Sequence, residues 1–180
     1  MRLTSRWPSV LIAVACLMPA PAVAQQVVRQ EVEGIRNLAR IESTVACAGA
    51  ITPKAVAEIK KMGYGAIINL RLATETGADI EGHTAAAQAA GIRYIHIPFS
   101  ASNPDPAAVD EFLKVITSPG VEPAFIHWAG GGRAAGMWLM KRAIVDGWDV
   151  DMSMEEATAL GLGNETMKQF FLDQIRQRKR

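Results

Sequence analysis

The sequence predicts an α/β domain built around a largely parallel sheet. Short apolar runs alternate along the chain with segments whose apolar residues recur at helical spacing, the pattern of successive strand–helix units. Of the 180 residues, the 156 that follow a predicted leader of 24 are enough for one domain with a hydrophobic core and too few for two ordinary ones. We therefore expect a short N-terminal approach segment at residues 25–36 and one domain at residues 37–180.

The first 24 residues have the features of an export signal. Arg2 and Arg6 give a positive start, residues 10–18 form an apolar stretch, and residues 22–24 provide a small-residue cleavage pattern. The stretch is too short to span a bilayer comfortably, and no later run reaches about 18 uninterrupted apolar residues. We expect cleavage after Ala24 and a periplasmic or secreted protein without a stable membrane anchor.

Charge and cysteine content narrow the range of functions. The leader removes two of the 19 basic side chains and leaves 17 against 18 acidic ones, which gives no general attraction to nucleic acid. Cys16 lies in the leader, so Cys47 has no partner for an internal disulfide, and we interpret it as a small buried hydrophobic residue. A lipoprotein acylated at Cys16 is the alternative to simple export, although the better cleavage pattern lies downstream.

The elements follow in order from the approach segment. Thr52 and Pro53 resemble an N-cap and a first helical residue, and Gly63 ends that helix. Pro119 ends a later helix that Asp105 begins. The predicted elements are a helix at 53–62, a strand at 66–70, a helix at 79–90, a strand at 93–97, a helix at 105–118, a strand at 124–127, and helices at 133–146, 153–160 and 165–176.

The most informative feature is the segment from Phe125 to Arg133, in which a short strand meets three glycines and then a helix. A glycine-rich turn at this place points successive backbone N–H groups into one concavity, and the helix dipole adds positive character. Arg133 could add a bidentate fork that matches phosphate or sulfate oxygens. The other interpretation is a tight turn in which Arg133 only makes an ion pair.

Two nucleotide-binding motifs do not fit this loop. A Walker loop ends in Gly-Lys-Ser/Thr, whereas this chain has Gly132, Arg133 and Ala134. A dinucleotide fingerprint belongs to an opening strand–helix–strand unit, but here the glycines come late and are followed by mainly helical sequence.

The loop and the upstream Asn69-Leu70-Arg71 strand end, with Glu75, resemble the bacterial branch of the cysteine-dependent tyrosine and dual-specificity phosphatases. This branch is also found beside metallo-β-lactamase-like hydrolases, and its loop reads His-Cys, four residues, then Arg. The similarity covers residues 40–161 in the same order of elements. It implies a three-layer phosphatase-like fold, with a central, mostly parallel sheet flanked by helices.

The resemblance also implies roles for individual residues. In the family a cysteine thiolate attacks phosphorus, the loop N–H groups and arginine hold the phosphate oxygens, and an aspartate protonates the leaving group. Carried over, Arg133 holds phosphate and Asp105 is the candidate general acid, while Asp110 is a weaker one. The implied phosphate-binding set is Trp128, Ala129, Gly130, Gly131, Gly132 and Arg133. Asp105 also precedes Pro106, so a helix N-cap explains it equally well.

The position of the nucleophile holds Trp128, whose indole cannot perform the displacement. Ala134 stands where a hydroxyl residue often follows the arginine, and glycines replace small polar residues of the cradle. These departures predict a catalytically impaired pseudophosphatase that binds a phosphorylated small molecule, a phosphoprotein or an inorganic anion. The alternative is an active phosphomonoester hydrolase that uses His127, or a bound water with Asp105 as base; the four-residue spacing instead places His127 behind the loop as a hydrogen-bonding support.

The remaining polar candidates have structural interpretations. Arg71 and Glu75 lie at and after a strand end, where an ion pair bracing the cleft or direct substrate contact would explain them. His83 and His96 lie far apart in the sequence without a second ligand at metal spacing, so we expect neither a metal nor a cofactor. The sequence leaves the oligomeric state and the physiological ligand open.

Overall fold

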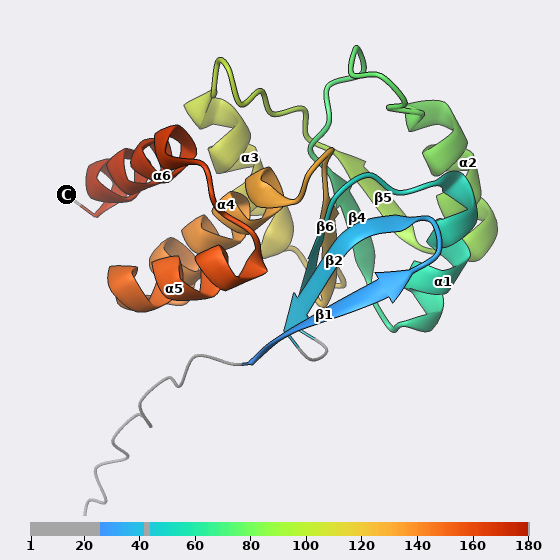
Figure 1. The fold of residues 1–180 in the computed structure, drawn as a ribbon, viewed down its shortest axis with the longest axis horizontal. Helices are drawn as coiled ribbons and strands as arrows, with labels where there is room; N and C mark the ends of the chain where they lie inside the picture. Colours follow the sequence, from blue (N-terminus) through green and yellow to red (C-terminus); the bar gives the residue numbers. More distant parts are fainter. Residues whose placement is uncertain (1–25, 42–43, 180) are drawn as a thin grey trace, which may run out of the picture.

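Six strands form one sheet in the order β1-β2-β3-β6-β4-β5 (Figure 1). The computed structural model describes residues 26–41 and 44–179, so the predicted leader at residues 1–24 and its cleavage site lie outside the described part. The β3–β6, β6–β4 and β4–β5 pairs are parallel, and the β1–β2 and β2–β3 pairs are antiparallel. The strands are β1 (Val27–Val32), β2 (Ile35–Ile41), β3 (Val45–Ala48), β4 (Ala66–Asn69), β5 (Arg93–His96) and β6 (Ala124–His127).

Helices cover both faces of this sheet and make the three layers that the sequence predicts. Helices α1 and α2 lie on one face, and α3 to α6 lie on the other (Figure 1). The helices are α1 (Val56–Lys61), α2 (Ile80–Ala90), α3 (Pro106–Ile116), α4 (Gly132–Met140), α5 (Val150–Leu160) and α6 (Glu165–Arg178). The prediction of a three-layer α/β fold with a mostly parallel central sheet is therefore confirmed.

Strand side chains alternate between two separate hydrophobic cores. In β3, Cys47 faces the core under α3 to α6, whereas Ala46 faces the core under α1 and α2. In β6 the same alternation sends Ile126 to the first core and Phe125 to the second. All four side chains are fully buried, and Cys47 is the buried hydrophobic residue that the sequence predicts. Because both faces are covered, the central strands β3, β4 and β6 are apolar except for the last residues of β4 and β6, Asn69 and His127.

The largest departure from the sequence prediction is at the N-terminal end. The predicted approach segment contains the whole of β1 and the start of β2, which pair as an antiparallel hairpin. Most residues of β1 are exposed, so the strand lacks the apolar alternation that would have identified it. The strand β1 forms by pairing with β2, which in turn pairs with β3 in the folded sheet.

The helix boundaries differ in smaller ways. Thr52 takes the N-cap position and Pro53 the first helical position, as predicted, but Thr52 makes no side-chain cap bond, and the chain enters α1 through a 3₁₀ turn at Pro53–Ala55. The predicted helix from Arg133 continues past α4 as a π-helical turn at Lys141–Val145. Helix α5 starts three residues before its predicted start, because Asp149 caps it by accepting hydrogen bonds from two backbone N–H groups. No helix in the described part of the chain has the length and apolarity needed to cross a membrane.

Candidate functional site

The parallel strands bring four chain segments to one edge of the sheet. Ala48 of β3 and Asn69 of β4 both pair with His127 of β6, and Asn69 pairs in turn with His96 of β5. The carboxyl ends of all four strands therefore lie in register. Such an edge is where ligands bind in open α/β sheets, because the loops that follow the strands meet there.

The segment at residues 128–131 connects β6 to α4 across this edge. The three glycines lie at the junction of the strand and the helix, as the sequence predicts. Gly131 has a φ of +110°, a conformation that residues other than glycine rarely adopt. The backbone N–H groups from Ala129 to Arg133 donate to no other residue in the described segments. Since α4 starts at Gly132, its N-terminal partial positive charge lies at the same place.

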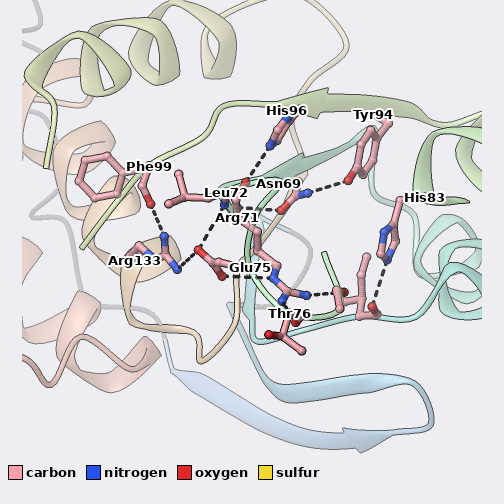
Figure 2. Close-up of polar contacts among 12 residues, drawn as sticks. Asn69, Arg71, Leu72, Glu75, Thr76, His83, Tyr94, His96, Phe99 and Arg133 are labelled. Carbon is pink, nitrogen blue, oxygen red and sulfur yellow. Dashed lines mark hydrogen bonds and ion pairs between the residues drawn. The ribbon is translucent and has the colours of Figure 1, made fainter. Parts of the chain in front are cut away.

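Arg133 lies at the start of α4, and its side chain is only 5% exposed. Its Nη2 donates to Oε1 of Glu75 at 2.6 Å, and its Nη1 donates to the carbonyl oxygen of Phe99 (Figure 2). Its Nε is buried and has no acceptor among the described residues. Two of the guanidinium nitrogens are therefore held in place by the protein, and the third is a donor without a partner.

Glu75 connects Arg133 to a second buried arginine. Its Oε2 accepts from Nε of Arg71 at 3.3 Å, so the predicted ion pair is confirmed, and its Oε1 also accepts from the backbone N–H of Leu72. Burial raises the pKa of Glu75, but hydrogen bonds from Arg133, Leu72 and Arg71 outweigh it, so this pKa is lower than usual. Arg71 also donates to the carbonyl oxygens of Thr76 and Gly77, which closes the loop after β4 (Figure 2).

The indole of Trp128 lies against the guanidinium of Arg133. The centre of its ring is 3.7 Å from Cζ of Arg133, the distance of a close cation–π contact. A Cβ atom built on Gly130 would lie 3.2 Å from Cζ2 of the indole, so the ring also covers the glycine segment. The indole Nε1, like Nε of Arg133, is buried without an acceptor among the described residues. Trp128 thus stacks on the arginine, and Nε1 of Trp128 and Nε of Arg133 are two buried donors without an acceptor in the described part of the chain.

His127 is completely buried behind the loop. Its ring is 5.8 Å from that of His83, and neither of its nitrogens has a hydrogen-bond partner in the described part, so the predicted hydrogen-bonding support is wrong. Burial lowers the pKa of His127 well below its usual value, and the charges of His83, Arg71 and His96 lower it further. The imidazole is therefore neutral at physiological pH.

The two aspartates near α3 both have structural partners. Asp105 is exposed and caps α3, because its Oδ1 accepts from the N–H of Ala107 at 2.9 Å; the cap interpretation is confirmed. Asp110 pairs with Arg178 of α6 at 2.5 Å. Neither aspartate contacts the loop at residues 128–133 through a described hydrogen bond or ion pair.

The other two histidines, His83 and His96, contact backbone carbonyl oxygens. His96 Nε2 donates to the carbonyl oxygen of Arg71 at 2.7 Å, and His83 Nε2 lies 3.0 Å from the carbonyl oxygen of Ile51. In the described segments, no group of three or more His, Cys, Asp or Glu side chains could hold a metal ion. The sequence did not predict the carbonyl of Phe99 as a partner of Arg133, because every residue type has a backbone carbonyl and the side chain at that position does not identify it.

The three-layer fold and the loop at residues 128–133 together indicate a class of protein. A glycine-rich segment between a parallel strand and a helix, followed at once by a buried arginine, brings backbone N–H groups and a guanidinium together in a way that suits an anion. Residues 37–145 match the family described as "Beta-lactamase hydrolase-like protein, phosphatase-like domain", and the chain belongs to this family. No curated protein matches the chain.

Three solved structures with the same fold are 15–23% identical to this chain in sequence. A DUF442 protein from Shewanella putrefaciens CN-32 has a TM-score of 0.64 at 19% identity, over 81% of this chain and 95% of its own. A variant of TpbA from P. aeruginosa in complex with phosphotyrosine has a TM-score of 0.61 at 23% identity, over 88% and 91%. The catalytic domain of the S. cerevisiae PP-IP phosphatase SIW14, in complex with citrate, has a TM-score of 0.62 at 15% identity, over 82% and 93%.

Proposed function

We propose that this protein is an exported, catalytically impaired member of its family that binds phosphate-like anions at residues 128–133. The observation that carries the proposal is a concentration of N–H donors without acceptors. Five backbone N–H groups, the Nε of Arg133 and the Nε1 of Trp128 have no acceptor among the described residues. A tetrahedral oxyanion supplies several acceptors at once, and a hydrogen bond to the buried Nε of Arg133 would relieve a cost of about 1–3 kcal/mol.

The impairment follows from the side chain at residue 128. In the family the corresponding position carries the thiolate that attacks phosphorus, whereas an indole has no electron pair available for in-line displacement. The ring also covers Arg133, so an anion must displace it to reach the guanidinium. Trp128 therefore removes the covalent step and acts as a plug over the site.

The ligand class is a phosphorylated molecule. One structural neighbour holds phosphotyrosine and another holds citrate, which are both oxyanions. A phosphorylated small molecule, a phosphoprotein or inorganic phosphate would each present the acceptors that the loop lacks. Asp105 keeps the role of candidate general acid only for a chain that has a nucleophile.

An active hydrolase that uses His127 is less well supported. The imidazole is fully buried behind the loop, whereas a phosphoryl acceptor must reach the phosphorus from the open side. Covalent phosphohistidine at His127 after incubation with an aryl phosphate would establish this activity. Its absence, together with an aryl phosphate left intact, is what the plugged site predicts.

Anion binding is expected to appear as a rise in melting temperature. Orthovanadate at about one hundred times its Kd should add about 2.7 kcal/mol to the free energy of unfolding. For a domain of this size, that corresponds to about 5–10 °C. Differential scanning calorimetry over a vanadate titration measures the increment directly. Arg133→Ala should abolish the vanadate-dependent increment whatever its effect on the baseline.

Two further variants serve as controls for that titration. Arg176→Ala removes an exposed arginine whose one ion-pair partner among the described residues is Asp173, and it should leave the increment unchanged. Trp128→Gly removes the plug and should lower the Kd for vanadate. An increment that survives Arg133→Ala, or a Kd that Trp128→Gly does not lower, would contradict the proposed site and the plug respectively.

Export makes a separate prediction about the mature N-terminus. Expression of the full chain in a host with a periplasm should yield an exported protein that begins at Gln25, as read by intact mass. Ala22→Asp and Ala24→Asp together should retain the leader, because the cleavage site needs small residues. A mass that corresponds to lipid attached at Cys16 would instead establish the lipoprotein alternative.

A further inference from the structure

Asn37 is the one non-glycine residue of the described segments with a positive φ, at +50°. It lies in β2, where extended backbone is the rule, and it breaks the regular conformation of the strand. A residue other than glycine in the left-handed region costs free energy, and such positions are retained where the surroundings use the resulting geometry. Asparagine is among the few residues that tolerate it.

The side chain of Asn37 contacts the loop at residues 128–133, called the anion loop below, although Asn37 and Gly130 are 93 residues apart in the sequence. Its Nδ2 donates to the carbonyl oxygen of Gly130 at 3.2 Å. The neighbouring carbonyl oxygen, that of Ala129, accepts from the backbone N–H of Ala50 at 3.1 Å. Two successive carbonyl groups of the loop are thus held by groups from the β2–β3 side of the sheet.

These two bonds determine where the loop N–H groups point. In a trans peptide, the C=O and the following N–H point in opposite directions. Holding the carbonyls of Ala129 and Gly130 toward β2 and β3 therefore turns the N–H groups of Gly130 and Gly131 away from them. Those two N–H groups are members of the unsatisfied set at residues 129–133.

A run of glycines needs such an external constraint. Glycine occupies positive and negative φ almost equally well, so the peptide between Gly130 and Gly131 can rotate at little steric cost. The N–H groups of a rotated peptide would no longer converge with their neighbours. A hydrogen bond to the carbonyl of Gly130 from outside the loop opposes this rotation.

We propose that Asn37 is a positioning residue for the anion loop, which it keeps in its binding conformation through the carbonyl of Gly130. The inference rests on the proposed function, because it concerns the same loop. The left-handed backbone of Asn37 aims the amide at the loop, and the amide supplies the donor. Aspartate has nearly the same shape but would place an acceptor against the carbonyl oxygen.

Two substitutions separate this role from a purely structural one. Asn37→Gly keeps the positive φ without strain but deletes the amide, so the melting temperature without anion should stay the same or rise. The affinity for orthovanadate should fall by about three- to tenfold, the effect of one hydrogen bond. Asn37→Asp should lower the affinity further, since its carboxylate faces both the carbonyl of Gly130 and the incoming anion. Both quantities come from calorimetric vanadate titrations of the full mature protein.

The outcomes distinguish this inference from the proposed function. Wild-type protein that shows no vanadate-dependent increment would refute the proposed function and this inference with it. Wild-type protein that binds vanadate, with an Asn37→Gly variant of equal affinity, would refute the positioning role alone. If the anion-free melting temperature falls together with the affinity, Asn37 serves the hairpin and not the loop.

Discussion

The Trp128→Cys variant is expected to hydrolyse a general aryl phosphate at a rate far above that of the unaltered chain. The substitution would place a thiol at the N-terminal end of α4, among N–H groups that donate to no described residue. At helix N-termini and beside cations, cysteine pKa values fall from about 8.5 to about 3.5–7.5, so a thiolate would be available at neutral pH. The same change removes the indole that covers Arg133.

Matched variants test which part of the change matters. Trp128→Ser opens the site equally but supplies no thiolate, so its rate is the proper baseline. Adding Arg133→Ala to Trp128→Cys should lower the rate by about 10²–10³-fold, the usual loss when a donor to the transition state is removed. Adding Asp105→Asn should slow substrates with poor leaving groups if Asp105 acts as the general acid.

The result that would contradict the proposal is equally specific. If Trp128→Cys is no faster than Trp128→Ser while both bind vanadate, the loop holds anions in a geometry unsuited to in-line attack. In that case a nucleophile at residue 128 is not sufficient for catalysis. If neither variant binds vanadate, residues 128–133 do not form an anion site.

The Glu75→Gln substitution should produce the largest loss of stability at the site. Glu75 faces Arg71 and Arg133, whose side chains are each 5% exposed, and its removal would leave two buried cations without a counter-charge. Breaking a buried pair costs about 3–5 kcal/mol, and because Glu75 is itself 20% exposed we expect the lower end, about 3 kcal/mol. The melting temperature should then fall by about 6–12 °C at pH 7.

The pH dependence of that loss has a defined sign. The pKa of Glu75 is lowered in the folded protein, so its stabilising contribution is complete above the unfolded pKa of about 4.3. The contribution disappears as the pH falls through the lower folded pKa. The difference in melting temperature between wild type and Glu75→Gln should therefore be constant from pH 7 to about pH 5 and shrink toward pH 3.

The control for this measurement is Glu58→Gln. Glu58 pairs with Lys61 on the surface of α1, where the side chain of Glu58 is 49% exposed and that of Lys61 is 74% exposed. An exposed pair of this kind contributes about 0–1 kcal/mol, and the variant should melt close to the wild type. Equal losses for Glu75→Gln and Glu58→Gln would show that the Glu75 network does not support the site.

Much of the architecture was predictable because it depends on local patterns. The strand at Ala124–His127 and the helix that starts at Pro106 agree with the sequence, since apolar periodicity and proline placement act within a few residues. The hairpin of β1 and β2 was not predictable in this way. Four of the six residues of β1 are exposed, and pairing with β2 outweighs their weak local preference.

The features of the site also fall into those that the sequence predicts and those that only the tertiary structure shows. Sequence alone determined that a glycine segment joins a strand to a helix and that Arg133 ends this segment, because both depend on residue type and order. That Trp128 stands at the position of the family's nucleophile is a prediction from the resemblance. Only the tertiary structure decided that Glu75 holds Arg133 across 58 residues, that Asn37 holds Gly130 across 93, and that the indole lies over the guanidinium. Such contacts arise where distant segments meet at one sheet edge, and a backbone carbonyl such as that of Gly130 belongs to every residue type alike.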